Sequence, residues 1–128
     1  MSSEQMRQAL DAYFDGIRSM DAEQYVAAFA DDAVVEDPVG TPPLANHDAR
    51  RQFYAGIASL FRNLSLDPDH LYVNGNQAAV KWTGHGTTKG GKPVQFDGID
   101  VVTINDAGEV QRVMAYWDTS AMMAQIEG

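Results

Sequence analysis

Three short segments rich in glycine and asparagine divide the second half of the chain into four long runs of extended character. These segments are Asn74-Gly75-Asn76, Lys89-Gly90-Gly91-Lys92 and Asn105-Asp106-Ala107-Gly108. Glycine, asparagine and aspartate tolerate the positive φ angles that tight hairpins require. The spacing therefore predicts a meander of antiparallel strands, which lie near residues 64–73, 78–88, 93–104 and 109–118.

The beginning of the chain is predicted to be helical. Apolar side chains recur there at helical spacing and define the buried face of a first helix. They are Met6, Leu10, Tyr13, Phe14 and Ile17. Ser2 or Ser3 can cap this helix, because a serine side chain accepts hydrogen bonds from the first free N–H groups. A second, shorter helix follows, with Asp21 as its candidate cap. Its apolar residues are Tyr25, Val26 and Phe29.

A third helix is expected after a short extended run and a loop. Pro38 forces Asp37 toward an extended conformation, so the run Ala33 to Asp37 is expected to be a strand. Asn46 can cap the third helix. Its apolar face carries Ala49, Phe53, Gly56, Ile57, Leu60 and Phe61. The last residues, 120–128, form either a short helix or a frayed tail. Helices followed by an antiparallel meander predict a single α+β domain over residues 1–128.

Composition and charge exclude several classes of function. The 128 residues contain no cysteine, which removes disulfide scaffolds, thiolate metal sites and thiol nucleophiles. The formal net charge of −9 repels phosphate, so we expect no nucleic-acid partner and no anionic membrane surface. The N-terminus shows no secretory signal, and no apolar stretch is long enough to cross a membrane. We therefore expect a soluble, cytoplasmic protein.

Common catalytic motifs are also missing. The segment Gly86 to Lys92 has the spacing of a phosphate-binding loop, but Pro93 stands where a metal-binding hydroxyl is needed. A hairpin is the better interpretation, because a strand and not a helix follows. The histidines His47, His70 and His85 share no ligand spacing, so no metal site is expected. No serine lies in a nucleophile-elbow context.

One carboxylate stands in an unusual place. In the strand predicted near residues 93–104, side chains alternate between two faces, and Asp100 shares its face with apolar residues. These are Phe96, Val102 and Ile104. A lone ionised carboxylate is costly there and tends to take up a proton. Asp100 is therefore either a neutral hydrogen-bond donor, or an aspartate that pairs with an arginine or faces water.

Two further side chains have both a structural and a catalytic interpretation. Asp37 precedes Pro38, where aspartate commonly initiates a turn. Tyr13 lies on the apolar face of the first helix, and a buried phenol usually finds a hydrogen-bond partner. Taken singly, each is more simply explained as structural. Considered together with Asp100, however, they favour the catalytic interpretation.

Together these residues stand in a pattern that resembles the bacterial steroid Δ-isomerases, or ketosteroid isomerases, of the nuclear transport factor 2-like and SnoaL-like superfamily. The matching segments extend from about residue 9 to residue 118. They are Ala30-Asp31-Asp32-Ala33, Val35-Glu36-Asp37-Pro38-Val39-Gly40, Pro42-Pro43, Phe53-Tyr54, Asp97-Gly98-Ile99-Asp100-Val101 and Ala115-Tyr116-Trp117. The Glu-Asp-Pro run alone is shared widely in the superfamily. Its combination with a tyrosine on the first helix and an aspartate in mid-strand is more specific.

The resemblance implies a fold and a set of roles. The fold is a curved antiparallel sheet wrapped by three helices into a cone around an apolar pocket. The catalytic base falls on Asp37, and the two donors to the substrate oxyanion fall on Tyr13 and Asp100. Ketosteroid isomerases are the established example of an aspartic acid held neutral so that it can donate a hydrogen bond. No cofactor is needed for this chemistry.

The resemblance also assigns residues to the pocket. Tyr54 falls on a supporting pocket tyrosine, whose hydroxyl we expect to assist Tyr13, and Trp117 falls on a pocket aromatic. The remaining residues expected to contact substrate are Phe53, Phe29, Val102 and Val113. Phe29 stands where some members carry a further tyrosine of the hydrogen-bond network, so the resemblance does not extend to that part of the network.

The expected activity is isomerisation of a 3-oxo-Δ5-steroid to the conjugated 3-oxo-Δ4-steroid. The alternatives are another enzyme of the same fold, of the polyketide cyclase or dehydratase type, or a noncatalytic dimer that binds hydrophobic molecules. Epoxide hydrolysis is disfavoured, because no Asp–Arg–Asp set for positioning water is evident. Ile99 and Val101 make the second face of the strand apolar as well. A sheet with two apolar faces needs two partners, which predicts a homodimer.

Overall fold

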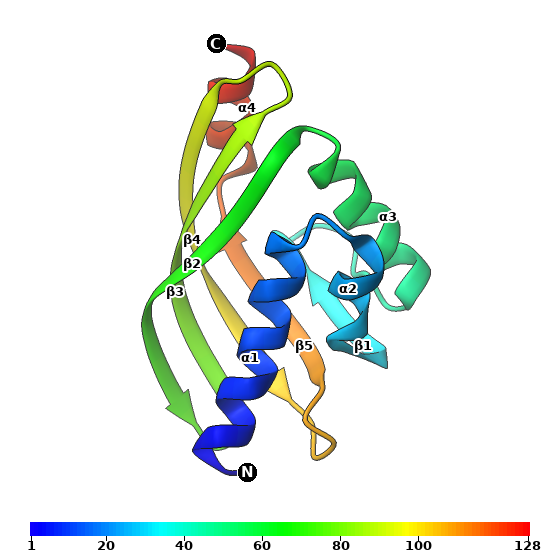
Figure 1. The fold of residues 1–128 in the computed structure, drawn as a ribbon. Helices are drawn as coiled ribbons and strands as arrows, with labels where there is room; N and C mark the ends of the chain where they lie inside the picture. Colours follow the sequence, from blue (N-terminus) through cyan, green and yellow to red (C-terminus); the bar gives the residue numbers. More distant parts are fainter.

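A computed structural model describes all 128 residues and has the predicted α+β architecture. Figure 1 shows long, curved strands beside a layer of helices. In chain order the elements are α1 (Ser3–Arg18), α2 (Ala22–Ala27), β1 (Phe29–Glu36), α3 (His47–Ala58), β2 (Phe61–Asn74), β3 (Gln77–Thr88), β4 (Pro93–Ile104), β5 (Val110–Trp117) and α4 (Thr119–Glu127). The C-terminal segment is thus a helix and not a frayed tail.

The sheet has five strands in the order β1-β5-β4-β3-β2. Strands β2 to β5 form the predicted antiparallel meander, and its hairpins use glycines with positive φ, among them Gly75 at 60° and Gly91 at 92°. Strand β1 adds to the edge of β5 in the parallel sense. The extended run predicted over Ala33 to Asp37 lies largely in β1, which begins earlier, at Phe29, and ends at Glu36, one residue before Asp37. The parallel pairing brings the end of β1 beside the end of β5.

Helices α1, α2 and α3 begin where the sequence predicts caps. Ser2 and Gln5 form a reciprocal capping box at the start of α1. The side chains of Asp21 and Asn46 accept hydrogen bonds from the first turns of α2 and α3. Asp118 does the same for α4. Each cap satisfies N–H groups that have no partner inside their helix.

Two aromatic residues lie in different elements from those predicted. Phe29 was expected on the second helix, but α2 ends at Ala27 and Phe29 begins β1. Phe61 was expected on the third helix, but α3 ends at Ala58 and Phe61 begins β2. Both side chains are nonetheless fully buried. Apolar spacing reports which residues reach the core, and it does not distinguish the last turn of a helix from the first residue of a strand.

The core lies between the inner face of the sheet and the helices. The predicted apolar face of α1 is buried against the sheet, and Val80, Trp82, Asp100 and Val102 are buried on the inner face. The outer face keeps large apolar side chains at the surface, including Ile99 and Tyr116. On β4 itself Ile99 and Val101 are the apolar residues of the outer face, as the sequence predicts, but Gln95, Asp97 and Thr103 make the rest of that face polar. None of the helices combines the length and apolar character that a membrane crossing requires.

Candidate active site

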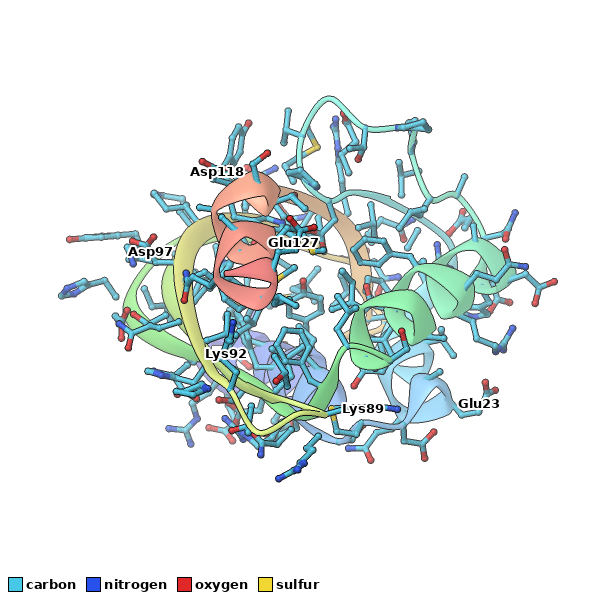
Figure 2. The ribbon with its side chains drawn as sticks, turned by 90° about the horizontal axis from the view of Figure 1, so that it is seen from above. Glu23, Lys89, Lys92, Asp97, Asp118 and Glu127 are labelled. Carbon is cyan, nitrogen blue, oxygen red and sulfur yellow. The ribbon has the colours of Figure 1, made fainter.

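A pocket with about 500 Å³ of space between its atoms, open solvent at its mouth included, lies between the helices and the inner face of the sheet. Fourteen residues line it, and twelve of them are hydrophobic. The other two are Asp37 and Asp100. In Figure 2, which views the molecule from above, side chains fill the space between α4 and α3. Met122 of α4 is part of the lining. The two predicted catalytic carboxyls are thus the polar exceptions in an apolar cavity.

Asp100 lies in the middle of β4 and is 1% exposed. The Tyr13 hydroxyl donates a hydrogen bond to its Oδ2 at 3.1 Å, and the Trp82 indole Nε1 donates to its Oδ1 at 2.9 Å. Both partners are buried as well. The alternative interpretation of Asp100, as a residue paired with arginine or facing water, is therefore wrong.

Trp82 was not singled out from the sequence. It is on β3, on the inner face, and it lies opposite Gly98 of β4. A Cβ atom at position 98 would lie 2.5 Å from the Trp82 ring, so only glycine leaves room for the indole there. Strand alternation puts Trp82 and Asp100 on the inner face, and the hairpin pairing makes them diagonal neighbours. That pairing is the signal that could have identified the contact.

The surroundings of Asp100 favour its neutral form. Burial raises the pKa of Asp100 to about 7, and the nearby charge of Asp37 acts in the same direction. The hydrogen bonds from Trp82 and Tyr13 oppose this rise, because they stabilise the carboxylate. Burial and the charge of Asp100 also raise the pKa of Tyr13 well above its usual value, so its phenol stays protonated.

Asp37 follows directly on β1, at the start of the loop that leads to α3. The indole Nε1 of Trp117, at the end of β5, donates a hydrogen bond to Asp37 Oδ1 at 2.6 Å. The backbone N–H of Val39 donates to the carbonyl of Ala115 at 2.7 Å, which holds the loop against β5. Burial of the carboxyl raises the pKa of Asp37 to about 6, while the Trp117 hydrogen bond lowers it.

The other residues expected in the pocket divide into two groups. Phe53, Tyr54 and Trp117 line it. Phe29, Val102 and Val113 are not among its lining residues, and their side chains are buried elsewhere in the hydrophobic core. The remaining lining side chains, such as Phe96 of β4, come from the same helices and strands.

The hydroxyl of Tyr54 has a different partner from the one expected. It donates a hydrogen bond to the backbone carbonyl of Ile17 at 2.6 Å and does not bond to Tyr13. Tyr54 therefore ties α3 to the end of α1. Its ring stacks on that of Tyr25, and its hydroxyl makes no hydrogen bond to the Tyr13–Asp100 pair.

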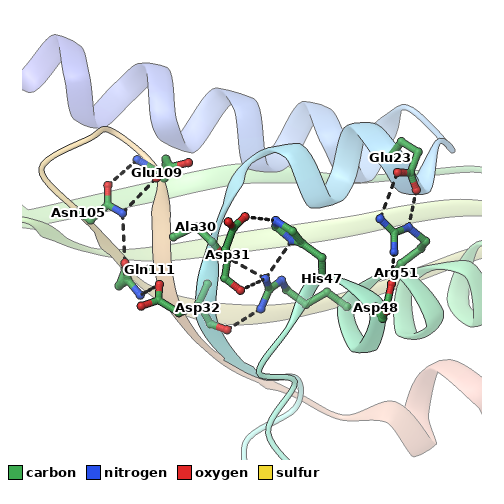
Figure 3. Close-up of polar contacts among 12 residues, drawn as sticks. Glu23, Ala30, Asp31, Asp32, His47, Asp48, Arg51, Asn105, Glu109 and Gln111 are labelled. Atoms are coloured by element: carbon green, nitrogen blue, oxygen red, sulfur yellow. Dashed lines mark hydrogen bonds and ion pairs between the residues drawn. The ribbon is translucent and has the colours of Figure 1, made fainter.

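A buried arginine lies outside this pocket. Arg50 of α3 donates hydrogen bonds to the backbone carbonyls of Ala30, Asp31 and Ala33, and so holds α3 against β1. Figure 3 shows His47 and Asp31 of the same cluster in contact. No arginine lines the pocket, so its aspartates have none of the arginine partners that an Asp–Arg–Asp set requires. No group of three His, Cys, Asp or Glu side chains is placed to hold a metal ion.

Known proteins resemble this chain in sequence and in fold. A steroid Δ-isomerase of Nocardioides simplex is 25% identical over 122 residues, which cover 94% of this chain and 96% of that protein. The epoxide hydrolase/cyclase-like enzyme SalBIII, which acts in pyran ring formation in the polyether salinomycin, has a TM-score of 0.80 at 23% identity, over 94% of this chain and 97% of that one. An LEH-like epoxide hydrolase of Mycobacterium tuberculosis has a TM-score of 0.77 at 18% identity, over 97% and 90%.

The structural neighbours establish the predicted cone-like fold, and their differing chemistries show that the fold alone does not define the reaction. The family assignment comes from the sequence. The SnoaL-like domain matches residues 10–113, which include Tyr13, Asp37 and Asp100. This chain therefore belongs to the SnoaL-like domain family.

Proposed function

We propose that the protein is a steroid Δ-isomerase that moves a carbon–carbon double bond into conjugation with a 3-oxo group. The observation that carries the proposal is the hydrogen bond between Tyr13 and Asp100 inside an apolar pocket that also holds Asp37. Two hydrogen-bond donors and a separate carboxylate base are the groups that proton transfer beside a carbonyl requires. The distant similarity to the Nocardioides enzyme supports the same assignment.

Asp37 acts as the base in the first step. Its carboxylate removes a proton from the carbon between the carbonyl and the alkene. The electron pair of that C–H bond forms a new double bond to the carbonyl carbon, and the carbonyl π electrons move to oxygen. The product of this step is a dienolate and a protonated Asp37. In the second step Asp37 returns the proton to the far end of the conjugated system, and the carbonyl forms again.

Tyr13 and Asp100 stabilise the dienolate oxygen in our proposal. The indole of Trp82 can only donate, so Asp100 Oδ1 is an acceptor in either protonation state. The Tyr13 hydroxyl can either donate or accept, so in our proposal the proton of neutral Asp100 lies on Oδ2, the oxygen that faces Tyr13. From there it can be donated, together with the Tyr13 hydroxyl proton, to one substrate oxygen. The site is apolar, which strengthens both hydrogen bonds.

The two carboxyls titrate in the order that this mechanism needs. Asp37, with a pKa of about 6, loses its proton before Asp100, with a pKa of about 7. Between these values the predominant state has Asp37 ionised and Asp100 neutral. The charge on Asp37 itself helps to keep the proton on Asp100. One carboxyl can therefore act as base while the other acts as donor.

The pocket suits a steroid, which is large, nonpolar and carries few polar groups. Aromatic rings make up much of its wall, with Phe96 and Trp117 tilted against one another at a centroid distance of 5.6 Å. The apolar lining supplies affinity, while the polar groups orient one oxygen of the ligand.

We also propose that two copies of the chain associate through the outer face of the sheet. Ile99 and Tyr116 are paired across β4 and β5 and are about half exposed, and Tyr72 of β2 is exposed on the same face. Large apolar side chains grouped on one face favour an interface. Light scattering coupled to size-exclusion chromatography should give the mass of a dimer, and Ile99→Lys should shift that mass toward the monomer. A monomeric mass for the unaltered chain contradicts this assembly.

The experiment that tests the activity is a spectrophotometric assay of a 3-oxo-Δ5-steroid. Formation of the conjugated enone produces an ultraviolet absorbance that the substrate lacks. We expect turnover by the unaltered chain and almost none by Asp37→Asn. Steroid binding without turnover would instead support a noncatalytic binder. Absence of both would favour another enzyme of the fold, such as a cyclase or dehydratase.

A further inference from the structure

Tyr25, which the proposed mechanism does not use, occupies a central position in the aromatic part of the pocket. It lies on α2, is 2% exposed and is one of the lining residues. Its ring stacks on that of Tyr54 at a centroid distance of 4.6 Å and packs edge-on against Phe29 at 5.1 Å. The ring of Tyr13 lies 6.5 Å away. Such packing on several sides fixes the direction of the Tyr25 hydroxyl.

The hydroxyl of Tyr25 is buried and has no hydrogen-bond partner in the structure. Buried hydroxyls are nearly always bonded, because leaving one without a partner is unfavourable. The neighbouring Tyr54 obeys this rule through its bond to the Ile17 carbonyl. Tyr25 differs from Tyr54 in this one respect, although the two rings are stacked and line the same cavity.

The charges around Tyr25 keep its hydroxyl protonated. Burial raises the pKa of Tyr25 well above its usual value, and Asp37 and then Asp100 act in the same direction. Arg50 acts in the opposite direction, and Tyr54 adds a small rise. The Tyr25 ring lies 6.5 Å from the ring of Tyr13, and both residues line the pocket with Asp100. Tyr25 is therefore a protonated O–H donor in the part of the pocket that holds Tyr13.

We propose that Tyr25 donates a hydrogen bond to the oxygen of the bound molecule, as a third donor beside Tyr13 and Asp100. The ligand class is an apolar ring compound with a carbonyl, enolate or phenolate oxygen at this end of the pocket. The proposal uses the pocket of the proposed function, but it concerns binding and does not depend on turnover. Tyr25 thereby makes the site selective for ligands that carry this oxygen over hydrocarbons of similar shape.

Two conservative variants test this role against each other. Tyr25→Phe removes the hydroxyl without a partner, and Tyr54→Phe removes the stacked hydroxyl that is bonded to Ile17. The probes are 2-naphthol and naphthalene, which share a ring system and differ by one oxygen. Affinities can be measured by calorimetry or by the fluorescence of the pocket tryptophans. Thermal unfolding of each variant without ligand provides the second readout.

The expected results separate a binding role from a structural one. Tyr25→Phe should weaken 2-naphthol binding by roughly 3- to 10-fold, the range for one hydrogen bond, and leave naphthalene binding unchanged. Its melting temperature should equal or exceed that of the unaltered chain, since a buried group without a partner is removed. Tyr54→Phe should lower the melting temperature and leave the preference for 2-naphthol intact.

Three outcomes would overturn the proposal. One is a lower melting temperature with unchanged 2-naphthol affinity in Tyr25→Phe, which would indicate a purely structural hydroxyl. Another is an unaltered chain that binds naphthalene as well as 2-naphthol. The third is an unaltered chain that binds neither probe. The enone assay tests the proposed isomerase activity separately. If Tyr25→Phe loses 2-naphthol affinity but the unaltered chain does not turn over the steroid, the role of Tyr25 is supported and the isomerase activity is refuted. If the unaltered chain turns over the steroid but Tyr25→Phe keeps its 2-naphthol affinity, the isomerase activity is supported and the role of Tyr25 is refuted.

Discussion

Asp37 and Asp100 each accept a hydrogen bond from an indole N–H in the same pocket, but they lie in very different parts of the fold. Asp37 is at the end of the edge strand β1, next to a proline-containing loop, and its only side-chain partner is Trp117. Asp100 is in the middle of β4, the central strand of the sheet, and bonds to both Trp82 and Tyr13. The carboxyl of Asp100 is therefore fixed within the sheet, whereas that of Asp37 lies at the junction of a strand and a loop.

This difference matches the two roles that we propose. A base must first take a proton from one carbon and then deliver it to another, so a position at the end of a strand is useful. A donor to the oxyanion must not move, because preorganised donors stabilise developing charge without further rearrangement. Burial raises the pKa of both carboxyls, and the charge of Asp37 adds to the rise at Asp100. The difference between the two pKa values therefore arises from the proximity of the two carboxyls as well as from the burial of each.

The largest expected effect comes from removing the base. Asp37→Asn should lower turnover by roughly 10²- to 10⁴-fold, the usual contribution of a positioned general base. Steroid binding should be retained or tightened, because the amide keeps the shape and no longer carries charge. Steady-state kinetics of the enone reaction and equilibrium binding measure the two effects. Near-normal turnover by the purified variant rules out Asp37 as the base.

The stability of this variant serves as its control. In the folded protein the pKa of Asp37 is about 6, above the usual aspartate value of 3.8. As pH rises from about 4 to 6, the unfolded state ionises first, so the free energy of unfolding of the unaltered chain should fall. Asparagine does not ionise. Asp37→Asn should therefore be the more stable protein above pH 6, and this advantage should vanish near pH 4.

The second effect concerns the donor in the sheet. Asp100→Ala should lower turnover by about 10²- to 10³-fold, as expected for loss of one oxyanion donor. Asp100→Asn should lose less, because its amide can accept from Trp82 and donate toward the substrate oxygen. An Asp100 that is ionised in the working enzyme gives the opposite result, since asparagine would then remove a repulsion and raise turnover. Infrared titration of labelled Asp100 follows the protonation state directly.

The dependence of turnover on pH should report the ionisation of both carboxyls. Turnover at low substrate requires ionised Asp37 and so should rise as pH increases through about 6. It also requires neutral Asp100 and so should fall as pH increases through about 7. The result is a narrow bell with its maximum between these values and roughly sixfold less activity at pH 8. Asp100→Asn should abolish the alkaline limb and keep the acid limb; a profile with both limbs unchanged would contradict the assignment of Asp100.

Much of this arrangement follows from local sequence patterns. The hairpin segments define the meander, and alternation along β4 places Asp100 on the inner face. Helical spacing places Tyr13 on the buried face of α1. These are properties of single elements, which a sequence displays directly. Their roles come from resemblance to a family, and no single pattern would have assigned them.

The contacts that were not predicted all cross between elements. The bond from Trp82 to Asp100 depends on the register of β3 against β4, and the bond from Tyr54 to Ile17 depends on how α3 meets α1. Phe29 was assigned to the wrong element and to the wrong surface, because burial in a core and burial in a pocket wall produce the same apolar signal. A residue such as Tyr25 becomes conspicuous only when the partners of its hydroxyl are known.

The smallest expected effect tests the comparison of the two carboxyls most finely. Trp117→Phe and Trp82→Phe are the same change, and each removes one indole N–H from one aspartate. Each lost hydrogen bond stabilised a carboxylate, so each variant should raise the pKa of its own aspartate by about one unit. Activity at the pH optimum should change only a few-fold.

The two variants should nevertheless move different limbs of the pH profile. Trp117→Phe should shift the acid limb to higher pH, because Asp37 then needs a higher pH to ionise, and this should narrow the active range. Trp82→Phe should shift the alkaline limb to higher pH, because Asp100 then stays neutral longer, and this should widen the range. The dependence of turnover on pH, measured for both variants and for the unaltered chain, tests this assignment of the two limbs. If both variants moved the same limb, the assignment of base to Asp37 and donor to Asp100 would be wrong.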